Sequence, residues 1–121
     1  MEEKEKMMLN SQCKEDFEKW YSNEYVSKPN VYNNCFDLIS GENILEPFYK
    51  LPLSMQYGCY VDFFDSVGID LAIFKSKKIH RTEYMMGVYD VYLNSSIHSP
   101  WQSLTEARTE AIKKANEIYN N

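Results

Sequence analysis

The spacing of apolar residues changes along this 121-residue chain, and that change restricts the folds open to it. Near both ends the apolar residues recur every three or four positions, which is the period of an amphipathic helix. Between Tyr57 and Leu93 they alternate with other residues, which is the period of a half-buried strand. The two periods together predict an α+β fold, and the length fits a single domain spanning residues 1–121.

The two ends of the chain are the predicted helices. In the first 25 residues an apolar face would be formed by Leu9, Cys13, Phe17, Trp20 and Tyr21. We expect this helix to pack on the sheet, with docking of a partner as the alternative. Near the other end, Ser103 followed by Glu106 is a capping box, so a helix should begin there and run to about Tyr119. Its apolar stripe would contain Leu104, Ala107, Ala111, Ala115 and Ile118.

Three strands are expected between these helices. Two alternating runs, 57–64 and 67–74, would form a β-hairpin around the turn at residues 65–66, and 84–93 would be the third strand. Residues 26–55 contain several Asn and Pro residues, which predict an ordered connector with at most a short helix. The predicted order is α-β-β-β-α, a three-stranded antiparallel sheet with the N- and C-terminal helices on one face.

The outer face of the predicted hairpin is a candidate docking surface. Alternation would bury the aliphatic side and expose a half-polar side with Tyr60, Asp62, Phe64 and Asp70. On the polar faces of the first helix, Glu15 and Glu18 add carboxylates. With a net charge of −5, this surface would suit the basic groove of a partner. The alternative is that most of the rings line the core.

A short basic segment interrupts this acidic chain. Between residues 75 and 81 there is no acid, and the cations are Lys75, Lys77, Lys78 and Arg81. A basic loop between two strands could contact phosphate groups. Alternatively, the lysines only keep a hairpin tip soluble and prevent edge-to-edge aggregation.

The sequence contains no recognisable catalytic or metal-binding set, so we predict no enzyme activity and no cofactor. The residue types that could bind zinc are scattered: Cys13, Cys35, Cys59, His80 and His98. Asp62 and Asp65 would lie on opposite faces of one strand, which disfavours acid–base catalysis by the pair.

The chain also shows no targeting or membrane signal. Its first residues, MEEKEK, lack the apolar region of a signal peptide, and no apolar run reaches the roughly 20 residues that span a bilayer. We therefore expect a cytoplasmic protein with no membrane partner.

Two segments of the chain resemble small uncharacterised proteins encoded by phages and mobile elements. The first is YGCYVDFFDSVGI, residues 57–69, and the second is TEARTEAIKKANEIYN, residues 105–120. The matching positions are Phe64, Asp65, Ser66, Val67, Gly68, Ile69, Arg108, Glu110, Ala111, Lys114, Ala115, Asn116, Glu117, Tyr119 and Asn120. The resemblance covers under a third of the chain. It implies a phage or prophage origin and a structural role for both motifs, and it implies no reaction.

Given that resemblance, we expect a stoichiometric binding protein that inhibits a host defence system in an infected or lysogenic bacterium. The most specific form of this expectation is an anti-CRISPR protein that binds a nucleic-acid-guided effector. The expected partner is a host protein or nucleoprotein complex.

The predicted order is also similar to that of the double-stranded RNA-binding domain, which suggests an RNA-binding alternative. That family reads A-form RNA through its first helix, a hairpin loop and a lysine cluster at the start of its last helix. Here the last helix would begin with SLTEAR, so Glu106 stands where lysines would be needed. The likeness therefore implies RNA contact through the basic segment only, and a shared fold does not establish a shared function.

Overall fold

The computed structural model describes residues 9–24, 45–77 and 79–121. These residues form the helices α2 (Ser11–Ser22), α4 (Leu45–Tyr49), α5 (Leu53–Ser66) and α6 (Leu104–Asn120) and the strands β1 (Ile69–Lys77), β2 (Thr82–Asp90) and β3 (Ser95–Trp101). The strands make one antiparallel sheet in the order β1-β2-β3. The α+β class and the three-stranded antiparallel sheet with helices at both ends of the chain are confirmed.

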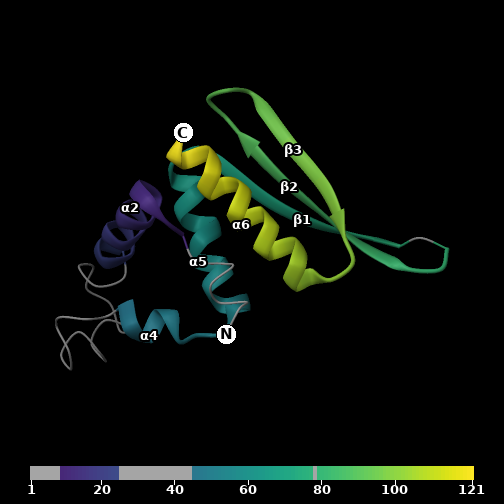
Figure 1. Ribbon diagram of the computed structural model, residues 1–121, viewed down its shortest axis with the longest axis horizontal. Helices are drawn as coiled ribbons and strands as arrows, with labels where there is room; N and C mark the ends of the chain where they lie inside the picture. Colours follow the sequence, from purple (N-terminus) through teal and green to yellow (C-terminus); the bar gives the residue numbers. More distant parts are fainter. Residues whose placement is uncertain (1–8, 25–44, 78) are drawn as a thin grey trace.

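The helices cover one face of the sheet (Figure 1). Helix α6 lies across β1 and β2, α5 packs beside it against β1, and α2 packs on α5 and α6. Beyond the pairing of Tyr84 with Trp101, β1 and β2 continue without β3 as a two-stranded hairpin that projects past the helices. We call residues 75–84 the arm.

The predicted hairpin at residues 57–74 is wrong in its first half, because 53–66 is helix α5. The buried positions of α5 are Gln56, Tyr60, Phe63 and Phe64, whose spacing is that of a helix face. Aromatic residues fill both phases of the alternation here, and one position of the buried face is a polar Gln. Both facts hide the helical period in the sequence.

The remaining strands are displaced from their predicted places. Strand β2 corresponds to the predicted 84–93, two or three residues earlier in the chain, and 95–101 is an additional strand that was not predicted. Pro100 lies inside β3, opposite Met85. This is tolerated because β3 is an edge strand, where one side of the backbone has no ladder to complete.

An aromatic cluster joins three of the helices. The Phe17 ring of α2 lies 5.0 Å from that of Tyr60 in α5 and 5.4 Å from that of Phe48 in α4. All three side chains are fully buried or nearly so. The predicted first helix is therefore confirmed, and it packs mainly on helices rather than on the sheet. In the described part of the connector, Phe48 of the short helix α4 attaches the chain to the core as expected.

Helix α6 approaches the sheet closely. The predicted cap is present, since Glu106 N donates to Ser103 Oγ at 3.1 Å. Ala107, Ala111 and Ala115 are fully buried, and these small side chains let α6 lie directly over β2. The predicted alanine stripe is thus confirmed.

Residues at the end of α6 also supply hydrogen bonds to the start of α2. Asn10, at the N-cap of α2, makes no side-chain cap of its own. Instead, Cys13 N donates to Asn120 Oδ1 at 2.9 Å, and Asn116 Nδ2 donates to Asn10 Oδ1 at 3.0 Å. The Tyr119 hydroxyl donates to Asp16 Oδ2 at 2.6 Å. The Asn and Tyr residues of the C-terminal motif therefore have a structural role, which is to bind α2.

The DSVGI motif ends α5 and begins β1, rather than turning a hairpin. Gly68 adopts φ +88°, a left-handed conformation that favours glycine after a helix. Val67 N donates to Phe64 O, and Gly68 N donates to Asp65 O, so two of the last carbonyls of the helix are satisfied. Gly68 O in turn accepts from Val91 N at 2.9 Å.

Candidate functional site

The predicted docking surface is divided by the fold. Tyr60 and Phe64 were expected to be exposed and are fully buried, because they lie on the inner face of α5. The Tyr60 hydroxyl donates to Gln56 Oε1 at 3.1 Å, and burial raises the pKa of this hydroxyl. Neither side chain can contact a partner in this fold, so the prediction is wrong for both.

The acidic residues of the predicted docking surface differ from its aromatic residues, because most of them are exposed. Asp62, Asp70 and Glu15 are exposed, whereas Glu18 is half-buried and accepts a hydrogen bond from the Tyr49 hydroxyl at 2.8 Å. Glu18 therefore contributes to the contact between α2 and α4. The exposed carboxylates lie on separate elements, with Glu15 on α2, Asp62 on α5 and Asp70 on β1.

Two aspartates meet where α5 passes into β1. A hydrogen bond with Asp65 raises the pKa of Asp70, and desolvation and the like charge of Asp65 act in the same direction. Both carboxyl groups belong to exposed residues. With Asp62 one turn earlier on α5, they form an exposed acidic group at this junction.

The predicted basic segment lies on the arm. Lys75 and Lys77 are exposed on β1, and Arg81 follows the turn, whereas the side chain of Lys78 lies outside the described residues. Arg81 Nη2 donates to Glu83 Oε2 at 2.7 Å. Among the described residues neither Lys75 nor Lys77 has a carboxylate partner. Near the tip, Ile79 is 91% exposed.

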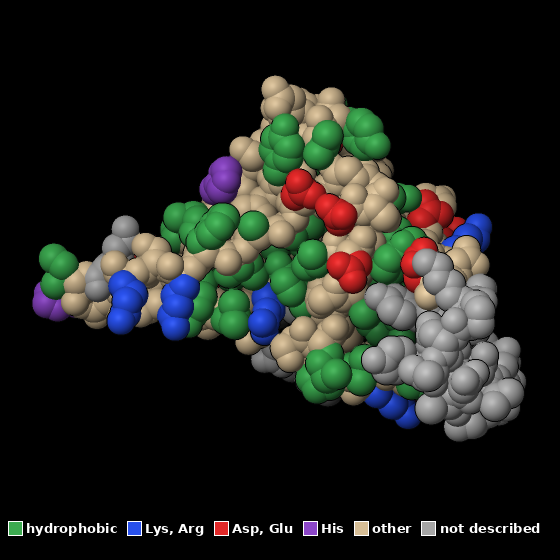
Figure 2. Space-filling view, turned by 180° about the vertical axis from the view of Figure 1, so that it is seen from behind, with side chains coloured by type: hydrophobic (Ala, Val, Ile, Leu, Met, Phe, Trp, Pro, Cys, Tyr) green, Lys and Arg blue, Asp and Glu red, His purple; other side chains and the backbone are tan. Residues whose placement is uncertain are grey.

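Charge is distributed unevenly over the surface. On the face shown in Figure 2, Lys and Arg side chains follow the arm and its base with no carboxylate among them, and the carboxylates lie over the body together with other Lys and Arg side chains. Because the Debye length in physiological salt is about 8 Å, an anion near the arm responds mainly to these nearby cations. The net negative charge of the chain therefore does not exclude anion binding here.

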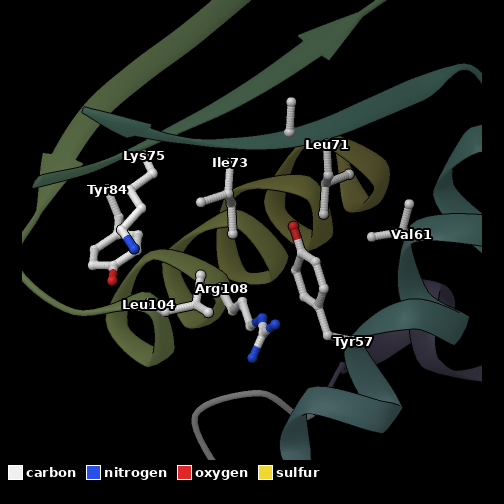
Figure 3. A pocket seen from close by; sticks show the side chains of 9 residues that line it. Tyr57, Val61, Leu71, Ile73, Lys75, Tyr84, Leu104 and Arg108 are labelled. Atoms are coloured by element: carbon white, nitrogen blue, oxygen red, sulfur yellow. The ribbon is translucent and has the colours of Figure 1, made fainter. Parts of the chain in front are cut away.

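An open groove of about 510 Å³ lies at the base of the arm, between α5, β1 and α6 (Figure 3). Its apolar floor includes Ile73 and Leu104. Lys75 stands at one end of the groove, and Arg108 and Tyr57 point into it from the other side. The groove and the cations of the arm form one continuous surface, since Lys75 belongs to both.

The cations of the groove rest on aromatic rings. The Arg108 guanidinium lies 5.5 Å from the centre of the Tyr57 ring, and Lys75 Nζ lies 6.0 Å from that of Tyr84. No acidic side chain lines this groove. Burial raises the pKa of Tyr57 to about 12, which the positive charge of Arg108 partly offsets. Tyr57 is therefore a neutral hydroxyl at physiological pH, and it makes no hydrogen bond to any described residue.

Some other cations of the described surface are ion-paired, unlike those of the groove. Lys50 Nζ lies 3.4 Å from Glu46 Oε2, and Lys114 Nζ lies 3.7 Å from Glu117 Oε1. Arg108 and Lys75 have no such partner among the described residues. Their charges are therefore available to a ligand.

Tyr57, Tyr84 and Arg108 were not predicted to be site residues, and Arg108 was named only as a matching position of the C-terminal motif. Leu104 and Arg108 are four residues apart on one helix, so the sequence predicts that they lie on the same helix face. These two residues lie beside Tyr57 and Lys75 only because α6 packs against α5 and β1. The spacing of residues within one segment does not predict that packing.

The described residues contain no group of three or more His, Cys, Asp or Glu side chains that could hold a metal ion. Burial raises the pKa of Cys13 to about 12, so this thiol stays protonated. Cys59 is half-buried, and Cys35 lies outside the described residues. His80 is exposed on the arm, and the His98 ring on β3 lies over Gly87.

Comparisons with known proteins give no relative. No family model matches the chain, and neither the curated proteins nor the solved structures include a significant match. In the part of the chain that the structure describes, no helix combines the length and apolar character needed to cross a bilayer.

Proposed function

We propose that this chain is a non-enzymatic binding protein that holds RNA by its phosphate backbone, through the arm. The observation that carries the proposal is the projection of the arm beyond the helical body, with its described cations Lys75 and Lys77 lacking a carboxylate partner among the described residues. Phosphate contacts by such cations supply most of the affinity of sequence-independent binding.

The position of the arm in the fold supports this function. The arm lies between β1 and β2, in the order α5-β1-β2-β3-α6, which is similar to the order of elements in the double-stranded RNA-binding domain. In that family the β1–β2 hairpin is one of the elements that contact RNA. This support comes from analogy in element order, because no solved structure matches the chain.

Reversal of charge on the arm tests the proposal. Binding of a labelled RNA is measured at about 50 and 200 mM salt for the unchanged protein and for Lys77→Glu/Lys78→Glu. We expect salt-sensitive binding that the double variant loses, with each lost phosphate contact lowering the salt slope by about one. Lys19→Glu, an exposed lysine on α2, is the matched control and should affect binding little. Equal binding by the two variants would remove the arm from the interaction.

A second candidate function is inhibition of a host nucleoprotein, most specifically as an anti-CRISPR protein in the cytoplasm of an infected or lysogenic bacterium. The observation that favours it is the exposed acidic group of Asp62, Asp65 and Asp70. Carboxylates on a rigid junction can occupy cationic sites that otherwise hold phosphates. The burial of Tyr60 and Phe64 removes the aromatic part of the surface first expected, so this function ranks second.

A co-elution experiment distinguishes the two functions. The protein is mixed with purified RNA-guided nucleases, each loaded with its guide, and the mixtures are separated by size. The inhibitor hypothesis predicts a complex that weakens in Asp62→Asn/Asp70→Asn and persists in Lys77→Glu/Lys78→Glu. If no nuclease co-elutes while RNA binding depends on the arm, the first function stands alone.

A further inference from the structure

We infer that the groove between α5, β1 and α6 accepts an unpaired nucleotide of the RNA strand that the arm holds. This inference rests on the proposed function and specifies its substrate, which is single-stranded or bulged RNA rather than a continuous duplex. The argument depends on the groove's charges, its apolar floor and the composition of the first turn of α6.

The groove offers cationic and hydrogen-bonding groups that the fold itself does not use. Lys75 and Arg108 have no carboxylate partner among the described residues, whereas Lys50 and Lys114, elsewhere on the described surface, are ion-paired. The half-buried Tyr57 hydroxyl has no hydrogen bond to a described residue, and it points into the groove beside Arg108. In an open groove this hydroxyl is hydrated, and a ligand that displaces the water has to offer an equivalent hydrogen bond. Phosphate oxygens and a ribose hydroxyl match these donors.

The apolar part of the groove fits a base rather than a second phosphate. Ile73 and Leu104 lie between Lys75 and Arg108, and the Tyr84 ring adds an aromatic wall below Lys75. Combined cationic and aromatic surfaces of this kind bind unstacked nucleotides, because each base has a flat apolar face. The volume of about 510 Å³ lies within the range of small-ligand sites.

The same fold lacks what a duplex would require. A double-stranded RNA-binding domain places lysines at the start of its last helix to reach phosphates across the major groove. Here the first turn of α6 contains Glu106, and its nearest cation, Arg108, faces the groove. A duplex would therefore gain contacts from the arm and none from this helix start, whereas an unpaired strand can enter the groove.

The test compares three labelled RNAs: a single strand of about 12 nucleotides, a duplex of about 16 base pairs, and the same duplex with a bulge. We expect the single strand and the bulged duplex to bind more tightly than the plain duplex. Arg108→Gln should remove this preference by weakening the two favoured RNAs about tenfold, and Arg108→Lys should retain most of it. Lys113→Gln, on the same helix but paired with Glu110, is the matched control.

Competition with uridine monophosphate and with inorganic phosphate distinguishes a strand from a free nucleotide. Unchanged preference in Arg108→Gln, with binding still abolished by Lys77→Glu/Lys78→Glu, would overturn the inference and leave the proposed function intact. If no RNA binds, the proposed function fails. Saturation by the free nucleotide alone, sensitive to Arg108→Gln, would then reassign the groove to small ligands. Should Arg108→Gln fail to fold, as judged by circular dichroism, Tyr57→Phe, which removes only the groove hydroxyl and lies outside the arm, gives the comparison instead.

Discussion

The helical end of the molecule and the arm contrast in almost every physical respect. At the helical end, Phe17, Phe48 and Tyr60 meet in a fully enclosed cluster whose buried polar group, Gln56, is hydrogen-bonded. None of the described residues of the arm is buried, and Ile79 is almost entirely exposed to solvent. The first region therefore supplies stability, and the second can be changed with little effect on the fold, which is where binding residues are tolerated.

The largest expected effect is at the centre of the aromatic cluster. Phe17→Ala should lower the free energy of unfolding by about 3–5 kcal/mol, because a buried ring is replaced by a cavity. Phe74→Ala, a 60% exposed ring on β1 beside the arm, is the matched control and should lower it by less than about 1 kcal/mol. Urea denaturation followed by circular dichroism measures both. Similar losses in the two variants would break the contrast between the regions.

The second largest effect on stability is expected at the hydrogen bonds between the end of α6 and the start of α2. Asn120→Ala removes the acceptor for Cys13 N at the uncapped start of α2, and we expect a loss of about 1–2 kcal/mol. Asn121→Ala changes the neighbouring exposed residue, whose recorded hydrogen bond comes from its backbone N–H. Thermal unfolding of the pair checks the difference. A neutral Asn120→Ala would show that α2 is held by its rings alone.

Gly68 and Gly58 differ in their backbone conformation and surroundings, so replacing each with alanine should change the stability in opposite directions. Gly68→Ala should destabilise by about 1 kcal/mol, since its φ of +88° is left-handed and a Cβ there would run into the Tyr92 ring. Gly58 lies inside α5 with open space around it, so Gly58→Ala should stabilise by about 0.5–1 kcal/mol. Effects of the same sign in a thermal melt would contradict the assignment of α5 as a helix through Gly58.

The smallest expected effect concerns the acidic junction. Because the pKa of Asp70 is raised in the folded state, the protonated form is favoured there, and its contribution to stability is lost as pH rises through that pKa. Asp70→Asn imitates the protonated form. At neutral pH it should therefore be more stable than the unchanged protein by about 0.5 kcal/mol or less.

Denaturation at several pH values measures this contribution. The gain from Asp70→Asn should disappear as pH falls below the usual aspartate range, where the unchanged protein is itself protonated. Asp62→Asn, at another exposed aspartate, serves as the control. A gain that does not change with pH would mean that the amide acts by some other contact.

The two helices whose sequences contain clear local signals, α2 and α6, were predicted correctly. Ser103 with Glu106 marks the start of α6, and the spacing of Cys13 and Phe17 marks the buried face of α2. Helix α5 was missed because its aromatic residues occupy both phases of a two-residue alternation, so tertiary burial rather than periodicity decides between helix and strand. Strand β3 was missed because Ser, His and Pro dominate it, and it exists as the partner of β2.

The candidate site was predictable only in part, for a similar reason. The cations of the arm are contiguous in sequence and were recognised from charge alone. The groove combines side chains from α5, β1 and α6, and its distinguishing property is the absence of carboxylates around Lys75 and Arg108. That property belongs to the packed surface, and no single segment of the sequence contains it.

The hydrogen bond from Cys13 N to Asn120 Oδ1 joins residues 107 positions apart, and this has a consequence for synthesis. On a translating ribosome, α2 emerges long before the residue that caps it has been added. Until Asn116 and Asn120 leave the exit tunnel, the nascent α2 lacks the hydrogen bonds that these residues make with its start. The cap of α2 therefore forms later than the contacts of Phe17 with α4 and α5, whose residues are added earlier.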